Sequence, residues 1–434
     1  MKRFLAQAAR AVKVDLEALE FGLRLAVLAA GARALEALLA GVGCSRRSEP
    51  VGCACGARMK SRGVEAKRIR TILGEIIFRR SRFVCPDCGA SRYPGDEALK
   101  VVGTGFSPGL RRLMARAGSR DTFSEGSGDL KEYAAVAVLA KDVERVAEQT
   151  GEEIAAWQER ERREVLAEGG AGKPGEEIPV LYASYDGTGV PMVPWEVAGR
   201  KGKQADGSAK TREAKLGCVF TQTKVDEDGW PVRDEASTTF VGAIEGCEAF
   251  GERMHGEAVR RGLGRARKVG VIGDGAKWIW ELAALHFPGA VEIVDLYHAR
   301  QHLHQLCGLL RLGQGETVAG VELRWRTALD EGRVEKLLTE AEARLPRSGA
   351  RRKTAKTELG YFRTNAARMR YAEFRDQGLF VGSGVVEAGC KTVIGKRLKQ
   401  SGMEWTVRGA NAIIPLRCCH LSGRIEEFWE QRAG

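Results

Sequence analysis

The segment from residue 178 to 297 constrains the fold more than any other part of the chain, because its hydrophobic pattern changes character halfway. Its first part contains apolar runs rich in β-branched and aromatic residues, at 178–187, 216–225 and 237–244. These runs are typical of antiparallel strands, and we expect 189–197 to return beside the first of them. Its second part has the pattern of a strand, a helix and a strand in succession, at 268–274, 276–287 and 290–297. The combination predicts an α/β domain whose mixed sheet is flanked by helices.

Lone carboxylates interrupt this apolar domain at two places, and a third occurs in a later helical segment. Asp186 lies between an apolar run and a glycine in "LYASYDGTG", and Asp274 has the same setting in "GVIGDGAKW". Glu387 falls in the first turns of a helix that we expect to begin near Ser383. Each has an ordinary structural explanation, because Asp caps turns and a first-turn Glu complements the helix dipole. Together they supply three hard oxygen ligands of the kind that Mg²⁺ or Mn²⁺ prefers.

The rest of the chain divides by composition into segments around this domain. A Gly-rich stretch at 168–177 has the composition of a linker, and we place the main boundary there. Residues 106–151 fit a helix-turn-helix with a tight connection near Leu139 and Ala140, and they fit a plain helical bundle equally well. We expect a helical segment at 1–43, a zinc-ribbon-like region at 44–103 and a second helical region at 104–168. The two parts of the α/β core are expected at 178–310 and 381–434, on either side of a helical insertion at 311–380.

The cysteine pairs of the second segment have a spacing close to that of zinc ligands. Cys85 and Cys88 form a Cys-x-x-Cys turn followed by glycine. Cys53 and Cys55 are one residue closer together, and Cys44 is available as a substitute ligand. Two such turns can place four thiolates around one Zn²⁺, so we predict a structural zinc ribbon, with reduced thiols that bind no metal as the alternative. A redox role fits less well, since no thioredoxin-like βαβ pattern surrounds either pair.

The chain resembles bacterial insertion-sequence DDE transposases of the ISKra group in four motifs: "YDGTGVPM", "GDGAKWIW", "DLYHARQHL" and "GSGVVEAGCKTVIGKRLKQSGMEW". The resemblance covers most of the chain and is strongest from 178 to 420. It implies an RNase H-like catalytic domain in which Asp186, Asp274 and Glu387 match the acidic triad that binds two Mg²⁺ or Mn²⁺ ions. It also implies strand cleavage and strand transfer at terminal inverted repeats, which the N-terminal region would recognise.

Other polar residues of these motifs have weaker signals. His298 has a spacing from Asp295 that related transposases also show, and it is a candidate for orienting a phosphate or Glu387; a structural role fits equally well. Trp405 is expected in the core, with stacking on a flipped base as the alternative. At helical spacing, four cations beyond Glu387 would lie one to three turns from the proposed carboxylates, where a scissile strand has to lie. We predict that these side chains contact DNA: Lys391, Lys396, Arg397 and Lys399.

The overall charge agrees with a polyanionic partner. Lys and Arg outnumber Asp and Glu by 69 to 57, a net charge of +12, and each phosphate neutralised by a cation releases counterions. We therefore predict double-stranded DNA as the partner, both element ends and target, and a homodimer or higher oligomer because two ends must be paired. The apolar run at 21–43 is interrupted by three charged residues. We expect no membrane span and a bacterial cytoplasmic, nucleoid-associated protein.

Two other functions are compatible with parts of the same pattern. A catalytically inactive or domesticated DNA-binding protein derived from a transposase would keep the fold and the basic surface. The presence of all three carboxylates in their glycine-rich settings speaks against it. A glycosidase would use two of the carboxylates as acid and nucleophile. It fits poorly with the positive charge, the paired cysteines and an aromatic content of 7%.

Overall fold

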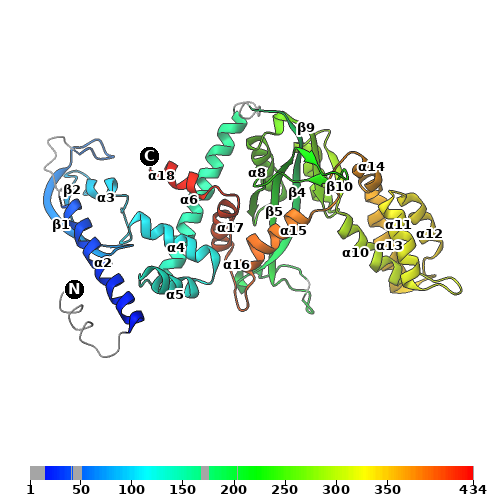
Figure 1. The fold of residues 1–434 in the computed structure, drawn as a ribbon, viewed down its shortest axis with the longest axis horizontal. Coiled ribbons are helices and arrows are strands. Elements are labelled where there is room, and N and C mark those ends of the chain that lie inside the picture. The colour runs from blue at the N-terminus through cyan, green and yellow to red at the C-terminus, as the bar shows by residue number, and fades with distance from the viewer. Residues whose placement is uncertain (1–14, 41, 43–50, 168–174, 203, 434) are drawn as a thin grey trace. The chain divides into compact units, whose positions relative to one another are not determined.

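The computed structural model describes residues 15–40, 42, 51–167, 175–202 and 204–433. The chain forms two compact units, 1–148 and 149–434, and the division falls inside helix α6 (Ala140–Ala167). Figure 1 shows the order of the elements by colour. Three sequence expectations lie wholly or partly outside the described residues: the substitute ligand Cys44, the start of the helical segment 1–43 and most of the linker 168–177.

A long antiparallel hairpin is the centre of the first part of the N-terminal unit. Its strands are β1 (Lys60–Thr71) and β2 (Gly74–Val84), and the short β3 (Ser91–Arg92) pairs with β2. Helix α2 (Leu16–Leu39) packs one side against this hairpin. The short α3 (Pro94–Ala98) carries the buried Asp96, whose carboxylate binds Lys67 at 2.9 Å and Arg80 at 2.5 Å. Since Lys67 and Arg80 come from the two strands, this acid ties α3 to both.

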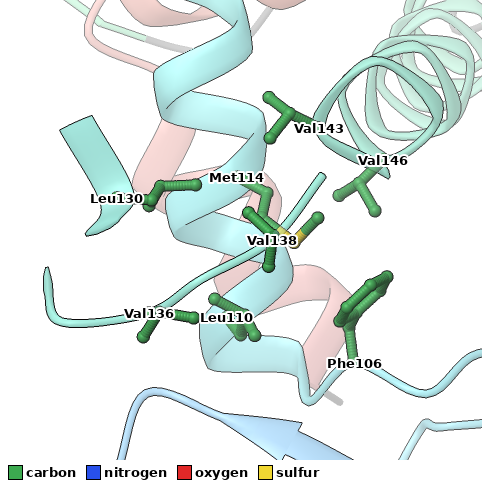
Figure 2. Packing of buried hydrophobic residues seen from close by; sticks show 8 residues of the cluster. All are labelled: Phe106, Leu110, Met114, Leu130, Val136, Val138, Val143 and Val146. Atoms are coloured by element: carbon green, nitrogen blue, oxygen red, sulfur yellow. The ribbon is translucent and has the colours of Figure 1, made fainter. Parts of the chain in front are cut away.

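Three helices complete the N-terminal unit: α4 (Pro108–Arg120), α5 (Phe123–Ala134) and the first part of α6. Thr122 and Glu125 form a capping box that fixes the start of α5. Ala135 ends α5 with a left-handed φ of 56°, and residues 135–139 connect it to α6, next to the connection that the sequence predicts. Eight buried side chains form the common core of this region (Figure 2): Phe106, Leu110, Met114, Leu130, Val136, Val138, Val143 and Val146.

A five-stranded mixed sheet with the order β10-β9-β4-β5-β8 is the centre of the C-terminal unit. Strands β4, β9 and β10 run parallel to one another, whereas β5 runs antiparallel to both of its neighbours. The predicted α/β class with a mixed sheet is therefore confirmed. The five strands are β4 (Ile178–Pro191), β5 (Thr211–Gln222), β8 (Thr239–Ala243), β9 (Ala266–Gly273) and β10 (Val291–Val294). Two short strands, β6 (Lys224–Val225) and β7 (Pro231–Val232), pair separately.

The expectation that residues 189–197 return beside the first strand is wrong. Strand β4 continues to Pro191 and pairs with β5 along its length, and the short α7 (Pro194–Val197) comes after it. Gly187 and Gly189 do not mark a turn. A Cβ at Gly187 would meet the Glu213 carboxylate at 2.6 Å, and one at Gly189 would meet a hydroxyl of β5 at 2.8 Å. These glycines therefore allow close approach between β4 and β5.

Helices cover both faces of the sheet. Successive side chains of a strand point to opposite faces, so Tyr182 and Tyr185 of β4 lie on different sides. The Tyr185 ring meets Phe250 of α8 (Cys247–Arg260) at 6.1 Å and Trp278 of α9 (Lys277–His286) at 6.0 Å. On the other face the Tyr182 ring meets Phe380 at 5.4 Å. Asp186 is an even number of residues from Tyr182 and so shares this second face.

The segment 311–380 is helical, as predicted, and gathers beyond the β10 edge of the sheet (Figure 1). It packs on α10 (Leu296–Leu309) and contains α11 (Val318–Asp330), α12 (Val334–Ala343), α13 (Gly349–Asn365) and α14 (Tyr371–Asp376). The chain then returns to the sheet through α15 (Gly384–Gly389), the π-helical turn η3 (Cys390–Gly395), α16 (Lys396–Leu398), α17 (Val407–Leu421) and α18 (Ile425–Ala433). Helix α15 packs on the two central strands, and α17 packs on β8.

Candidate active site

Asp186 lies on the central strand of the sheet, opposite Leu216 of β5. Its side chain is half-buried, and its Oδ1 accepts the backbone N–H of Gly187 at 2.7 Å. The Cys390 thiol, at the start of the π-helical turn, also donates to this carboxylate. The position is therefore defined by the sheet on one side and by the chain beyond α15 on the other.

Asp274 directly follows β9 and begins the turn into α9. Its Oδ1 accepts the N–H of Ala276 at 2.9 Å, so the ordinary explanation of this residue as a turn cap holds for one of its two oxygens. Its backbone carbonyl accepts the hydroxyl of Tyr361, which lies on α13 of the insertion, at 3.0 Å. Gly275 has a φ of +98°, and a Cβ there would lie 2.6 Å from the Tyr361 ring. The turn therefore requires glycine for both its conformation and its space.

Glu387 lies in the first turn of α15, which starts after Ser383 as predicted. The Ser383 hydroxyl donates to Glu387 Oε1 at 3.1 Å, and its backbone N–H donates to Asp295 Oδ2. Asp295 is completely buried, and its Oδ1 caps α10 by accepting the N–H of His298 at 2.6 Å. A buried carboxylate thus links the start of α10 to the loop that carries Glu387.

The charges of Asp274 and Glu387 act on the carboxylate of Asp186. The pKa of Asp186 is raised above its usual range, first because the side chain is buried and further because the charges of Asp274 and Glu387 are near; the Cys390 thiol and the Gly187 N–H oppose the rise. Asp274 and Glu387 are also half-buried. The fold thus brings together the three acids that the sequence singled out.

These acids do not form the tightest ligand cluster of the protein. Four cysteines form a tighter group, in which all ligand atoms lie within 4.8 Å of one another: Cys53, Cys55, Cys85 and Cys88. Among the described residues, this is the group of three or more possible metal ligands that meets that distance. A looser spacing suits a two-ion site. With ions about 3.5–4 Å apart and oxygens about 2.1 Å from each, ligands of different ions can be separated by about 8 Å. The donor set, three carboxylates, therefore fits Mg²⁺ or Mn²⁺.

The residues around the triad include some that the sequence signals weakly or not at all. Asp295 stands out in the sequence only by its spacing from His298, Ser383 is signalled only as the start of a helix, and Tyr361 carries no signal of its own. The His302 ring stacks on the Tyr361 ring at 3.8 Å, and its Nδ1 lies 2.6 Å from Glu358 Oε2. The His298 ring is 6.3 Å from that of Tyr361, with its backbone N–H held by Asp295. The auxiliary role of His298 stays a prediction.

The four predicted DNA-contacting cations do not share one face. Lys391, Lys396 and Lys399 are exposed, and Lys399 donates to the hydroxyl of Thr188, two residues beyond Asp186 on β4. Arg397 is instead completely buried, with its guanidinium 4.9 Å from the Trp405 ring centre. The prediction that Arg397 contacts DNA is therefore wrong, because its side chain has no access to solvent. Arg397 lies in the core. Trp405 is buried beside it, as expected.

The cysteine cluster has the geometry of a tetrahedral zinc site. The Sγ atoms of Cys53 and Cys88 are 3.5 Å apart, as are those of Cys55 and Cys85. Zinc with Zn–S bonds of about 2.3 Å would place its thiolates about 3.8 Å apart. The backbone N–H of Cys88 donates to Cys85 and is the main reason that the pKa of this thiol falls to about 7. The four cysteines can therefore hold a zinc ion, and the short Cys-x-Cys spacing does not prevent it.

Comparisons with known proteins add little to this geometry. No family model matches the chain, and no curated protein matches it. A solved structure titled "Drosophila P element transposase strand transfer complex" aligns with 59% of this chain and 66% of its own chain, just under two thirds, at 9% identity and a TM-score of 0.18. A TM-score that low carries no weight for fold or function. No helix among the described residues is long and apolar enough to cross a membrane.

Proposed function

We propose that this chain is a DNA transposase of an insertion sequence, with Asp186, Asp274 and Glu387 as the acidic triad of an RNase H-like catalytic domain. The observation that carries the proposal is the convergence of these half-buried carboxylates from a strand, a strand end and a helix onto one face of a mixed sheet. The four motifs that resemble the ISKra group support the finer assignment, because the triad residues fall inside three of them.

The triad would hold Mg²⁺ or Mn²⁺. Divalent cations bound there would supply Lewis-acid polarisation of a phosphodiester and a nucleophile at neutral pH. The chain's own residues position these ligands: Tyr361 holds the backbone at Asp274, and Ser383 holds the carboxylate of Glu387. Lys399 lies beside the strand that carries Asp186 and would neutralise a phosphate of the DNA.

The proposed reaction consists of two displacements at phosphorus. In the first, a water oxygen bonds to the phosphorus at the element end, the bond from phosphorus to the 3′ oxygen breaks, and a 3′-OH and a 5′-phosphate result. In the second, that 3′ oxygen bonds to a phosphorus of the target DNA and displaces the target's own 3′ oxygen, which takes a proton. Both steps are in-line displacements, so one acidic site can serve both.

A cleavage assay tests the proposal. The full chain is given labelled DNA with the ends of its own element and Mg²⁺, Mn²⁺, Ca²⁺ or EDTA, beside Asp274→Asn and the control Asp228→Asn. Asp228 is exposed and lies in the turn between β6 and β7, away from the triad. We expect nicking with Mg²⁺ or Mn²⁺ in the wild type and the control, and none in Asp274→Asn.

DNA binding measured in Ca²⁺ separates the proposed transposase from a non-catalytic relative. Asp274→Asn should bind element ends about as well as the wild type, because it alters the acidic site and leaves the basic surfaces in place. A folded wild-type protein that binds these ends but cuts them under no metal condition would contradict the proposal and favour a DNA-binding protein without catalysis.

A further inference from the structure

Trp195 is the most exposed tryptophan of the chain, and it lies beyond the end of the strand that carries Asp186. It belongs to the short helix α7, and 71% of its surface is exposed. Its indole makes no hydrogen bond, aromatic contact or cation–π contact with another of the described residues. Tryptophan offers a large, flat, apolar surface and is enriched where partners bind. This uncovered indole is therefore a candidate contact for a flat apolar group.

The backbone at Trp195 is held on both sides, so the exposure of the indole does not come from a loose loop. Before it, the N–H of Val193 donates to the carbonyl of Trp405 at 3.0 Å. After it, the Glu196 carboxylate accepts the N–H of Val407 at 3.0 Å. The same segment beyond α16 thus fixes the chain before and after the indole. A side chain on a fixed backbone has less conformational entropy to lose when a partner binds.

A line along strand β4 joins the acidic triad to Trp195. The strand rises about 3.3 Å per residue, so its end at Pro191 lies about 17 Å beyond Asp186. Lys399 meets the strand between these points, at the hydroxyl of Thr188. Trp195 follows the strand end within four residues. A DNA strand laid along this line would pass from the reacting phosphate to the indole in about five or six nucleotide steps, at 3.4 Å per step.

The surface along this line carries an excess of positive charge. In the described parts of 188–212 and 396–405, five exposed residues are cations and two are acids. The cations are Arg200, Lys201, Lys210, Lys396 and Lys399, and the acids are Asp206 and Glu404. The carboxylate next to the indole, that of Glu196, is half-buried and lies 3.9 Å from the guanidinium of Arg212. A polyanion is therefore attracted to the surface that presents Trp195.

A second exposed tryptophan has the opposite surroundings. Trp230 is 53% exposed in the turn between β6 and β7. Its N–H donates to the Asp226 carboxylate at 2.7 Å, and the exposed Glu227 and Asp228 lie in the same turn. Three carboxylates repel a polyanion, so an exposed indole alone does not indicate DNA. The combination of indole and cations at Trp195 favours a nucleic acid, and Trp230 is its matched control.

A base can stack on this indole only if one of its faces is free. In a duplex each face is covered by the neighbouring pair, whereas a single strand or an opened end leaves faces available. We propose that Trp195 is a stacking platform for an unpaired base of the DNA strand that reaches the acidic triad, about five or six nucleotides from the reacting phosphate. The distance to a reacting phosphate rests on the proposed function, whereas the preference of Trp195 for single strands does not.

Binding without cleavage tests the platform. Fluorescence anisotropy in Ca²⁺ measures the affinity of the full chain for a labelled thymidine strand of about 20 nucleotides and for a duplex of the same length, each longer than the proposed line. We expect Trp195→Ala to weaken single-strand binding about fivefold or more and duplex binding less than about twofold, because it removes a base-stacking face. Trp195→Phe keeps an aromatic face and should stay within about threefold of the wild type, and the control Trp230→Ala within about twofold.

The position of the stacked base is tested separately. Element ends with one unpaired strand carry 2-aminopurine, whose fluorescence falls on stacking, at successive positions from the reacting phosphate. We expect the wild type to lower the fluorescence most at about the fifth or sixth position and Trp195→Ala to abolish this minimum. A minimum that persists in Trp195→Ala would show that another residue stacks on the base.

Other results would overturn the proposal. Trp195→Ala that binds single strands within twofold of the wild type would exclude stacking, and an equal loss on single strand and duplex would indicate a general loss of the surface. A change of oligomeric state in sedimentation, with DNA affinity unchanged, would assign Trp195 to a protein contact. Circular dichroism checks that each variant is folded. A wild type that cuts no DNA but shows the Trp195 effect would contradict the transposase and leave the platform in place.

Discussion

The two clusters of candidate metal ligands in this molecule are assembled in opposite ways. The cysteines come from two turns at the open end of one hairpin, and all four sulfur atoms lie within 4.8 Å of one another. The carboxylates come from a strand, a loop and a helix, with the helical insertion between the last two in sequence. Local pairing is enough to form the first cluster, whereas the whole C-terminal unit must fold to form the second.

The difference arises from the chemistry of the ligands. Protonated thiols are neutral and do not repel one another, and the Sγ atoms of Cys53 and Cys88 lie 3.5 Å apart. Carboxylates repel one another, and the raised pKa of Asp186 records this in addition to its burial. Cations would offset this repulsion at the proposed acidic site, whereas the four cysteines can hold one zinc ion.

Removing one triad carboxylate should have the largest effect. Asp186→Asn, Asp274→Asn and Glu387→Gln are each expected to lower the cleavage rate on the order of 10³-fold or more, because each removes a charged metal ligand. Single-turnover cleavage of labelled element ends in Mg²⁺ measures it, with Asp228→Asn as the control. A loss below tenfold in any of the three would remove that residue from the triad.

Disrupting the cysteine cluster should affect DNA binding and folding but not the acidic site. Cys88→Ser is expected to lower bound zinc from about one ion per chain to a small fraction of that, because three thiolates hold the ion less tightly. Affinity for element ends should fall about tenfold or more. Metal analysis and a binding titration measure these, with Cys247→Ser, a half-buried cysteine outside the cluster, as the control. Full zinc content in Cys88→Ser would contradict the assignment.

Loosening the support of Asp274 should have a smaller effect on the same reaction. Tyr361→Phe keeps the ring and removes the hydroxyl that donates to the Asp274 carbonyl. A lost hydrogen bond of about 0.5–1.5 kcal/mol corresponds to a rise of about 2–10-fold in the Mg²⁺ concentration for half-maximal cleavage. Tyr133→Phe is the control, because this tyrosine is 75% exposed in the N-terminal unit. An unchanged Mg²⁺ requirement would show that Tyr361 does not position the site.

Burial of Asp186, together with repulsion from the other two carboxylates, should also appear in stability. Because its pKa is raised in the folded protein, ionised Asp186 destabilises the native state, and this cost is absent below the ordinary pKa of Asp and grows as pH rises through the raised value. Asp186→Asn is therefore expected to raise the melting temperature by a few degrees at pH 7 in EDTA and to lose this gain in acid. Thermal unfolding across pH measures it. A melting temperature unchanged or lowered at pH 7 would contradict a raised pKa of Asp186.

The sequence predicted the parts of the site that local patterns control. The strand before Asp274, the helix starting at Ser383 and the helical character of 311–380 are all explained by hydrophobic period and capping signals. These signals are short-range, so they survive without knowledge of the tertiary structure. The order of antiparallel strands followed by strand, helix and strand was sufficient to predict a mixed sheet.

The parts that the sequence did not predict depend on contacts between distant segments. Gly187 and Gly189 precede the segment that was expected to turn back beside β4. Their close approach to Glu213 and Thr211 of β5 is evident only in the folded sheet. The burial of Arg397 depends on tertiary packing, including its contact with the Trp405 ring, which a local charge pattern does not reveal. Tyr361 lies 87 positions from Asp274 in the chain, and nothing near it in sequence indicates that its hydroxyl reaches that backbone.

The contact between Tyr361 and the turn at Gly275 has a consequence for how this protein can change. The ring fills the space in which any side chain at Gly275 would lie, and its hydroxyl holds the adjacent carbonyl. The helical insertion therefore cannot be deleted without consequence for the site, because deletion would remove the Tyr361 ring that packs against the turn after β9. A chimera that exchanges the insertion must carry an aromatic hydroxyl at the same place, so the two segments have to be inherited or engineered as a pair.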